Sequence, residues 1–358
     1  MNAHNLLIAG GGTGGHLFPG IAIAQAFQQK NPMNKILFVG TGRPVEVKVL
    51  SASGFSYEKI SALGIKGKSL YHKIRAIGVI PKGIWEAIRI LRTFKPDVVL
   101  GVGGYSSAPV ILAAKFLGIR TAIHEQNVLA GITNRLLAHI VDRVYLSFEN
   151  TRIQCRKHKF CLTGNPVRQS IITAAEAIEK TKINLMAEGK WPFTVVILGG
   201  SQGAHSLNRV VVDSLQLVTK NQMVHWIHQT GEQDESWVQQ AYSEMGVSSE
   251  IKSFFNNMGE LYGKADLIIA RAGATTVAEI SAVRKPAIFI PYPHAADNHQ
   301  IYNVAGLVDL GVAEMIQESE INAERLSEKM MYYSEHPEVL KEMRHKATQL
   351  SHADAAET

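Results

Sequence analysis

The chain has 358 residues, a formal net charge of +6 and a hydrophobic content of 46%. This length is typical of about two domains, and the apolar content is sufficient for full cores. Two cysteines, Cys155 and Cys161, are too few for a disulfide framework, and no apolar run is long enough to cross a bilayer. The first residues lack the pattern of a secretion signal, so we expect a cytosolic protein or one attached to a membrane from the cytosol.

Short apolar runs alternate with amphipathic segments along the whole chain. Strands that are apolar on both faces, each followed by a helix, predict parallel sheets covered by helices, which is a doubly wound α/β fold. The expected strands are, in chain order, Leu6–Ala9, Lys35–Val39, Val98–Gly101, Thr121–His124, Arg143–Leu146, Thr194–Leu198, Met223–His228, Ile251–Phe254, Leu267–Ala270 and Ala287–Ile290.

The two halves of the chain resemble each other. LLIAGGGTGGH at 6–16 is similar to VVILGGSQGAH at 195–205, so each half starts with a strand, a glycine loop and a helix. We therefore predict two similar Rossmann-like domains, residues 1–163 and residues 164–337. The helical segment 338–358 follows the second domain and can join the first.

The first glycine loop, residues 10–15, formally matches the dinucleotide fingerprint. However, strand 35–39 is not followed by the acid that holds a ribose, and no Gly-Lys-Ser/Thr follows the loop as in a P-loop. Glycines let an anion approach the backbone, and the next helix offers free N–H groups. A tight turn with only a packing role explains a single loop of this kind equally well.

Three more loops stand at strand ends: the second, residues 101–107, the third, residues 199–203, and the fourth, residues 271–276. Open α/β sheets bind ligands at the carboxyl ends of their strands, so four such loops predict sites for two phosphorylated ligands or one large one. No Asp-x-Asp occurs, and the histidines of HAADNH at 294–299 are poorly spaced for one metal ion. We expect neither metal nor cofactor, so helix N-termini and cationic side chains would stabilise a departing diphosphate.

The positive charge is concentrated in residues 66–95, which hold eight Lys or Arg residues and one acid, Glu86. Apolar side chains such as Ile84, Ile88 and Leu91 lie among these cations, a pattern that suits an anionic membrane surface. A core-facing helix with a solvated basic side also explains part of the pattern. We expect no nucleic acid as partner, because the segment has few aromatic residues and no nucleic-acid motif occurs.

Seven segments occur in the order found in the MurG family of bacterial peptidoglycan glycosyltransferases, which the chain therefore resembles from Leu6 to about Arg344. They are GGTGGHLFPG at 11–20, GVGGYSSAP at 101–109, HEQN at 124–127, GNPVR at 164–168, GGSQGA at 199–204, RAGATTVAE at 271–279 and the DNHQ and YN residues at 297–303. The resemblance implies a GT-B fold with two Rossmann-like domains facing across a cleft. It also implies an inverting transfer of GlcNAc from UDP-GlcNAc to the C4 hydroxyl of MurNAc in lipid I, which forms lipid II.

The resemblance assigns the donor mainly to the C-terminal domain. Ser201 and the amides of the fourth loop would bind the diphosphate, Arg168 would add positive charge, Glu279 would take the ribose hydroxyls, and the Phe255 backbone would bind uracil. Gln300 and Asn127 would hold the GlcNAc. The complete implied set is Thr13, Gly14, Gly15, Asn127, Arg168, Ser201, Phe255, Ala274, Thr275, Thr276, Val277, Ala278, Glu279 and Gln300.

We expect the second loop to hold the acceptor diphosphate, through Gly103, Gly104, Tyr105 and Ser106. Inversion needs a base that takes the acceptor proton, and His16 at the end of the first loop has a suitable ordinary pKa near 6.5. His124 and Glu125 are competing candidates, and a role for His16 in positioning alone stays open.

Further partners implied by the resemblance are cell-wall synthesis and division proteins at the cytoplasmic face of the inner membrane. Two other enzymes are compatible with this scaffold: a GT-B transferase with a different lipid acceptor, and a UDP-GlcNAc 2-epimerase that needs no acceptor. HEQN together with GNPVR favours the peptidoglycan enzyme.

Overall fold

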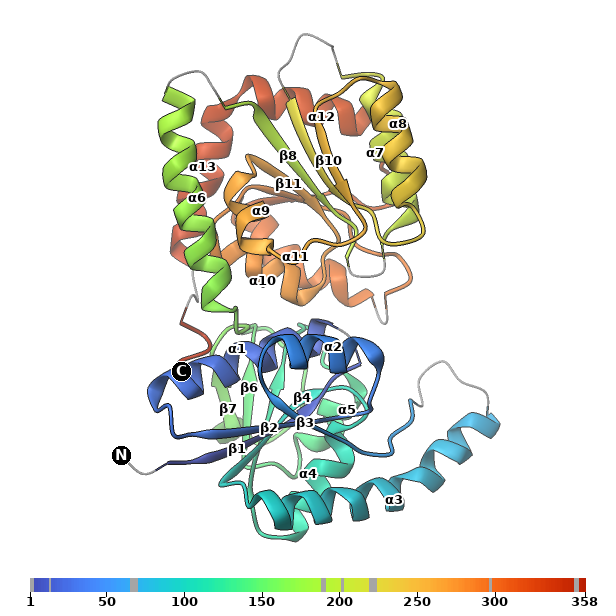
Figure 1. Ribbon diagram of the computed structural model, residues 1–358, viewed down its shortest axis with the longest axis vertical. Coiled ribbons are helices and arrows are strands. Elements are labelled where there is room, and N and C mark those ends of the chain that lie inside the picture. The colour runs from blue at the N-terminus through green and yellow to red at the C-terminus, as the bar shows by residue number, and fades with distance from the viewer. Residues whose placement is uncertain are drawn as a thin grey trace. The chain divides into compact units, whose positions relative to one another are not determined.

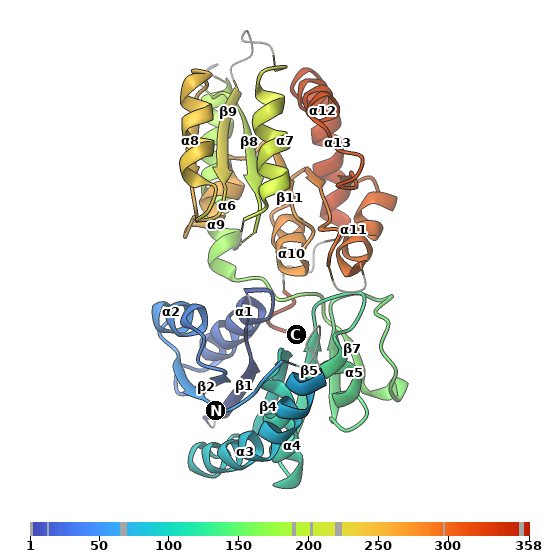
Figure 2. The same cartoon turned by 90° about the vertical axis from the view of Figure 1, so that its right-hand side faces the viewer.

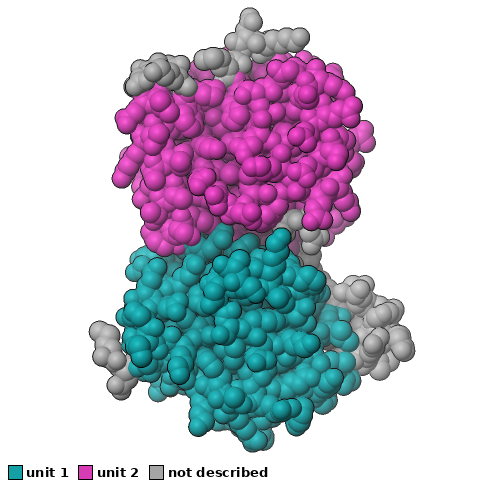
Figure 3. All heavy atoms as spheres, in the orientation of Figure 1, with its two compact units in different colours: residues 1–168, 352–358 teal, residues 169–351 magenta. Residues whose placement is uncertain are grey.

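The computed structural model describes residues 3–12, 14–64, 70–187, 191–200, 203–218, 224–295, 298–350 and 354–358. The chain divides into two compact units, unit 1 with residues 1–168 and 352–358, and unit 2 with residues 169–351 (Figure 3). Helix α13 (Pro337–Ala347) thus lies in unit 2, and only the last residues lie in unit 1, where the Lys30 Nζ donates to the Glu357 carbonyl at 2.5 Å.

Unit 1 contains a seven-stranded sheet in which all neighbouring strands are parallel (Figures 1 and 2). The chain moves outward from β1 to β3 and then returns to the other side of β1, so the strand order reverses between β1 and β4. Ligands bind at such switch points in open sheets. The strands are, in spatial order, β3 (Ser56–Lys59), β2 (Lys35–Gly40), β1 (Asn5–Gly10), β4 (Val98–Gly103), β5 (Arg120–Glu125), β6 (Arg143–Leu146) and β7 (Phe160–Leu162).

Helices cover both faces of the unit 1 sheet because alternate strand residues are apolar on both sides. Ile8 and Phe38 pack with α1 (Gly14–Lys30) and α2 (Pro44–Ala52). Leu7 and Val99 pack on the opposite face, with α3 (Leu70–Phe94), α4 (Ser107–Phe116) and α5 (Ile132–Leu137). The 3₁₀ turn η1 (Lys157–Lys159) precedes β7.

Unit 2 repeats this arrangement with a six-stranded parallel sheet, whose order reverses between β8 and β11 (Figure 2). The strands are, in spatial order, β10 (Ser249–Lys252), β9 (Val224–Gln229), β8 (Phe193–Leu198), β11 (Leu267–Ala270), β12 (Ala287–Phe289) and β13 (Ala313–Met315). The helices are α6 (Gln169–Ala187), α7 (His205–Leu215), α8 (Glu235–Glu244), α9 (Met258–Lys264), α10 (Ala274–Ala282), α11 (His299–Asp309), α12 (Ala323–Glu335), α13 and the 3₁₀ turn η3 (Thr348–Leu350).

One core of unit 2 lies on the face of the sheet covered by α7, α8, α12 and α13. Val195 and Ile197 of β8 pack there, and Trp226 meets Tyr242 edge to face with ring centroids 6.3 Å apart. Val196 and Leu198 are buried on the other face, as strand alternation requires. Each fully buried large side chain contributes about 1.5–3 kcal/mol.

The ten expected strands are confirmed over the described residues, although β10 begins two residues earlier than Ile251 and Met223 lies outside the described residues. The expectation misses three strands, β3, β7 and β13, all of which are short edge strands. SYEK in β3 and AEM in β13 carry polar residues, and FCL in β7 has only three residues, so none of them has the long apolar run that marks a central strand. None of the described helices is long and apolar enough to span a membrane.

Candidate active site

The first and second loops meet at the switch point of unit 1. The first follows β1 and the second follows β4, and these two strands are neighbours. Gly104, with φ of +83°, lies so close to the first loop that a Cβ there would be 2.6 Å from the Gly11 carbonyl oxygen. Glycine is thus required at position 104 by both conformation and space. The two loops form one surface at the carboxyl edge of the sheet.

His16 lies in the first turn of α1, and its ring packs against the second loop. A Cβ on Gly103 would be 2.7 Å from the His16 Cδ2 atom. The side chain is half-buried. The structure therefore brings the predicted base directly beside the predicted acceptor loop, while Thr13 lies outside the described residues.

Two consecutive serines at the start of α4 differ in their contacts. Ser107 Oγ lies 2.7 Å from the Ala9 carbonyl oxygen and 2.8 Å from that of Gly103, so its hydroxyl ties the ends of β1 and β4 together. Ser106 is 1% exposed, and its Oγ makes no hydrogen bond within the described part of the chain. A buried hydroxyl normally has a partner, so Ser106 is available to a ligand at this helix start. Tyr105, in contrast, is 38% exposed.

Glu46 on α2 is a site residue that the sequence analysis missed. Its side chain is buried, and its Oε1 accepts from the Gly12 N–H at 2.6 Å. Further donors to its carboxylate are the N–H groups of Thr41, Gly42 and Arg43 and the hydroxyls of Thr41 and Tyr57. An internal anion therefore occupies the N–H groups after β2 and fixes the first loop.

His124 of the HEQN segment is enclosed in the interior of unit 1. Its Nε2 lies 3.2 Å from the Gly164 carbonyl oxygen, and its Nδ1 lies 3.1 Å from the Gln126 Nε2, which suits a neutral ring protonated on Nε2. Burial lowers the pKa of His124 to about 4. An enclosed ring of lowered basicity does not suit the competing role of base, and its contact with Gly164 joins β5 to the GNPVR segment.

Glu125 organises its own loop. Its Oε1 accepts from the Asn127 backbone at 3.0 Å and from the Asn127 Nδ2 at 3.2 Å, while its Oε2 accepts from the Gly131 N–H at 3.1 Å and the Asn134 Nδ2 at 2.9 Å. The carboxylate is 2% exposed. Four donors therefore fix the position of this carboxylate within its own loop. The geometry favours a structural role for Glu125 and orients Asn127 beside it.

Arg168 is the last residue of unit 1 and packs on the helix that carries His16. Its guanidinium lies 4.3 Å from the centroid of the Phe18 ring, and a Cβ on Gly14 would lie 2.9 Å from the same ring. The structure thus places the cation against the first turns of α1, on the ring that also lies beside Gly14. Cation–π stacking holds the planar group in place.

The third loop, between β8 and α7, is supported by Gln229 at the end of β9. The Gln229 Nε2 donates to the Gly200 carbonyl at 3.2 Å, and its Oε1 accepts from the Phe255 N–H at 3.1 Å. The Phe255 ring is buried, 5.1 Å from the Lys252 Nζ. The N–H of the predicted uracil residue therefore already has a partner within unit 2. Ser201 lies outside the described residues.

The fourth loop leads into α10, whose N-cap is Gly273. Ala274, Thr275, Thr276, Val277 and Ala278 form its first turns, so the predicted diphosphate amides lie at a helix N-terminus, the favourable end for an anion. Glu279 is 6% exposed and accepts a hydrogen bond from the Tyr262 hydroxyl at 2.9 Å. Tyr262 lies on α9, far enough in sequence that no local pattern predicts this contact.

Gln300 at the start of α11 connects two strand ends. Its Oε1 accepts from the Ala272 N–H at 3.2 Å and from the Tyr292 N–H at 2.8 Å. Its amide oxygen is therefore used within unit 2, while its Nε2 makes no hydrogen bond to another described residue. This orientation leaves the predicted sugar ligand with a donor at this position.

Arg271 is a second residue that the sequence analysis missed. It is 7% exposed; its Nη2 donates to the Ser206 Oγ at 3.0 Å, and its Nη1 donates to the Ile290 carbonyl at 3.2 Å and pairs with Glu318. One guanidinium thus joins the first turn of α7 to the end of β12 and fixes the third and fourth loops relative to each other. Among the described residues, no group of three or more His, Cys, Asp or Glu side chains is placed to hold a metal ion.

Two parallel α/β units with ligand loops at the carboxyl ends of their strands define the GT-B class of fold. Two family models match the chain: the glycosyltransferase family 28 N-terminal domain over residues 6–146, and the glycosyltransferase family 28 C-terminal domain over residues 194–358. The chain belongs to glycosyltransferase family 28.

Curated relatives cover almost the whole chain. The UDP-N-acetylglucosamine–N-acetylmuramyl-(pentapeptide) pyrophosphoryl-undecaprenol N-acetylglucosamine transferase of Geotalea uraniireducens is 43% identical over 98% of this chain and 95% of its own length. The enzyme of the same name from Geobacter sulfurreducens is 41% identical over 98% and 96%.

Solved structures agree with this assignment. The crystal structure of Acinetobacter baumannii MurG is 30% identical and superposes with a TM-score of 0.77 over 99% of this chain and 97% of its own. The UDP-GlcNAc 2-epimerase of Neisseria meningitidis, at 16% identity and a TM-score of 0.68 over 99% and 97% of the two chains, shares the fold alone.

Proposed function

We propose that this chain is an inverting glycosyltransferase that moves GlcNAc from UDP-GlcNAc to the C4 hydroxyl of MurNAc in lipid I, the polyprenyl-linked acceptor, and so forms lipid II for peptidoglycan. The observation that carries this proposal is the 43% identity, over 98% of the chain, to a transferase named for that reaction. Each unit has two glycine loops suited to bind an anion, and the proposed reaction has one donor and one acceptor, each of which carries a diphosphate.

Unit 2 would hold UDP-GlcNAc. The backbone N–H groups of Ala274, Thr275 and Thr276 lie in the first turn of α10, where the helix dipole favours the diphosphate. Ser201 would add a hydroxyl from the third loop. Glu279, buried and oriented by Tyr262, would accept from the ribose hydroxyls.

Unit 1 would hold the acceptor diphosphate in the second loop. Gly103 and Gly104 both have positive φ, which turns the loop back on the strand end. Ser106 supports this assignment because its buried hydroxyl has no partner within the described residues. Arg168, stacked on Phe18, would supply positive charge beside the same edge.

His16 would act as the base. The acceptor O4 forms a bond to the anomeric carbon while the bond from that carbon to the diphosphate oxygen breaks, and UDP departs with the electron pair. The O4 proton goes to the His16 imidazole. One displacement of this kind inverts the α-linked donor to a β product, and a positioned base contributes about 10²–10⁴-fold to the rate. Glu125, with four internal donors, would order the loop beside it.

We also propose peripheral attachment to the cytoplasmic face of the inner membrane through residues 66–95. Within the described part of this segment, Trp85 is 57% exposed, and the Arg89 guanidinium lies 5.0 Å from its ring centroid. The same unit also has exposed apolar side chains on α4, where Phe116 is 79% exposed, and on α5, where Leu136 is 68% exposed. Apolar side chains beside cations suit an anionic bilayer. Vesicle co-sedimentation should therefore require anionic lipid and weaken with salt.

One assay tests the proposed reaction. Radiolabelled UDP-GlcNAc is incubated with a short-chain lipid I analogue, with and without added divalent metal. We expect UDP and a disaccharide product to form only when the analogue is present. UDP release or sugar isomerisation without the acceptor would favour the 2-epimerase alternative, and transfer to a different lipid would favour the other transferase.

A further inference from the structure

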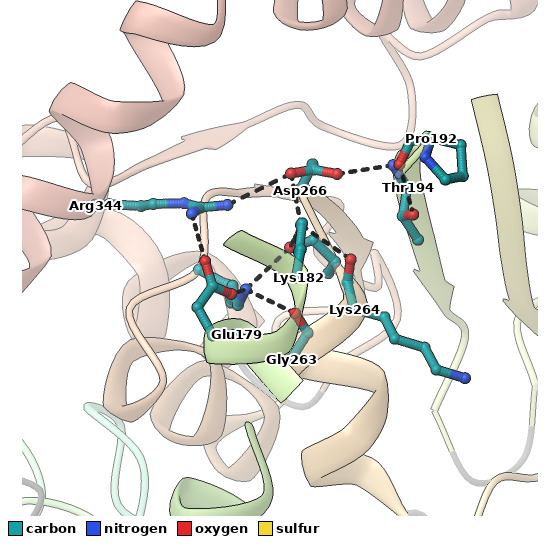
Figure 4. Close-up of polar contacts among 10 residues, drawn as sticks. Glu179, Lys182, Pro192, Thr194, Gly263, Lys264, Asp266 and Arg344 are labelled. Carbon is teal, nitrogen blue, oxygen red and sulfur yellow. Dashed lines mark hydrogen bonds and ion pairs between the residues drawn. The ribbon is translucent and has the colours of Figure 1, made fainter. Parts of the chain in front are cut away.

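A cluster of charged side chains lies at the amino ends of β8 and β11, at the opposite edge of the unit 2 sheet from the predicted donor loops (Figure 4). Lys182 of α6 donates to the Asp266 Oδ1 at 2.6 Å, and the Asp266 Oδ2 accepts from the Thr194 N–H at 2.9 Å. Glu179 pairs with Lys285 and accepts from the Arg344 Nη1 at 2.8 Å. Three segments distant in sequence therefore meet through ion pairs.

The cluster holds one positive charge more than its carboxylates neutralise. Three cations, Lys182, Lys285 and Arg344, share two acids, Asp266 and Glu179. The Lys182 and Lys285 side chains are only 1% and 3% exposed. Burying a charge without a counter-ion is costly. Burial, with Lys182 and Arg344 close by, lowers the pKa of Lys285 to about 8.

A cavity of about 310 Å³ opens beside this cluster. Its basic lining residues are Arg284 and Lys285, which follow α10, and Arg344 and His345 of α13; its apolar lining residues include Ile172 of α6 and Val283. Two carboxylates line it as well: Glu179 is committed to the ion pairs with Lys285 and Arg344, and Glu176 is exposed on α6. The cavity thus combines cations with an apolar wall.

Two cationic side chains of the cavity have features that the ion pairs leave unexplained. The Arg344 Nε is buried and makes no hydrogen bond to any described residue. Arg284 follows α10 with a φ of +55°, as is common after a helix C-cap, and its side chain is exposed where it lines the cavity. A guanidinium donor normally finds an acceptor.

We propose that this cavity binds a small oxyanion, either inorganic phosphate or a phosphate monoester, between Arg284, Lys285 and Arg344. The oxyanion neutralises the excess charge of the cluster and accepts hydrogen bonds from the guanidinium groups, for which Arg has a suitable planar donor geometry. The apolar wall accommodates the uncharged part of an ester. This site is separate from the predicted donor loops and does not depend on the proposed transferase reaction.

Thermal unfolding of the full chain tests the site, with inorganic phosphate and glycerol phosphate titrated against chloride at constant ionic strength. A ligand that binds the native state raises the melting temperature in a saturable way. We expect this response in the wild type and an apparent Kd at least about tenfold weaker in Arg284→Asn, which removes one cation but tolerates the left-handed φ. Arg344→Gln should behave in the same way. Tighter binding of the ester than of phosphate would indicate that the apolar wall takes part.

The matched control is Lys341→Gln, an exposed cation on the same helix as Arg344 that does not line the cavity. It should keep the wild-type response. Phosphate bound at the glycine loops contributes equally to every variant, so it cancels in the comparison. The proposal is overturned if Arg284→Asn retains the full response, if Lys341→Gln loses as much as Arg284→Asn, or if the wild type shows no saturable response. If Arg344→Gln does not fold, Arg284→Asn decides alone.

Discussion

The two units have the same strand, loop and helix arrangement, yet the residues that support their glycine loops differ in charge. In unit 1 the Gly12 N–H donates to the Glu46 carboxylate at 2.6 Å. In unit 2 the neutral amide of Gln229 contacts the Gly200 carbonyl at 3.2 Å. Gln229 ends β9, which has the position in the unit 2 sheet that β2 has in the unit 1 sheet. A carboxylate repels phosphate, whereas a neutral amide does not. The comparison indicates that the two units differ in the charge of the residue that supports the glycine loop, although the loops themselves are similar.

Replacement of His16 should have the largest effect of the changes that test this division of roles. We expect His16→Gln to lower kcat by about 10²–10⁴-fold because the acceptor proton loses its base. UDP binding, measured by calorimetry, should stay unchanged because the donor is assigned to unit 2. His139→Gln, at an exposed histidine of the same unit, is the control. A kcat close to that of the wild type would leave His16 with a positioning role only.

The second test separates the two ligands by changing the second loop. In Gly104→Val combined with Ser106→Ala, the new side chain collides with the Gly11 carbonyl and the hydroxyl is lost. The acceptor KM should rise at least about tenfold while the donor KM stays constant. Gly131→Ala is the control, because a Cβ there has no neighbour within 4 Å. A rise in the donor KM alone would refute the assignment of the acceptor to this loop.

The third test exchanges the charges of the two loop supports. Gln229→Glu places a carboxylate beside the third loop, as in unit 1, and should raise the donor KM about tenfold, equivalent to about 1.4 kcal/mol. The reciprocal change, Glu46→Gln, should leave the donor KM unchanged. Steady-state kinetics at saturating acceptor measure both. If the two variants affect the donor equally, the charge difference between the units has no role in ligand choice.

The last test concerns stability rather than catalysis, and a feature that the described parts of both units share, a buried neutral histidine. Burial lowers the pKa of His124 to about 4 and that of His228 to about 3. The unfolded chain therefore binds more protons than the native one below the ordinary pKa of 6.5, so stability is full above pH 6.5 and is lost on acidification. At pH 5, each of these two histidines should lower the free energy of unfolding by about 2 kcal/mol.

Urea unfolding at neutral pH and at pH 5 measures this loss. His228→Gln should reduce the acid-induced loss, because the variant has no imidazole to protonate at that position. The exposed His139→Gln should not. An equal loss of stability in all three proteins would assign the acid sensitivity to other groups.

The sequence was sufficient for the central strands and for the positions of all four loops, because buried parallel strands are apolar runs and glycines mark their ends. It did not predict Glu46 or Arg271, since a charged residue in a helix or after a strand usually lies in solvent. Their burial depends on partners elsewhere in the chain, such as Gly12 and Ser206. The burial of Glu279 has the same explanation, because Tyr262, which donates a hydrogen bond to it, lies on another helix. Contacts between distant segments leave no local pattern.

The Glu46 carboxylate also affects how inhibitors would distinguish the two halves of this chain. A compound that imitates a nucleotide by its diphosphate meets a resident negative charge at the first half and none at the equivalent position of the second. Of the first and third glycine loops, such a compound therefore favours the third, while the second loop stays the site assigned to the acceptor diphosphate. A compound that replaces the diphosphate with a cationic group would favour the first loop, beside Glu46. The sign of one charged substituent would therefore direct an inhibitor to one half of the chain or the other.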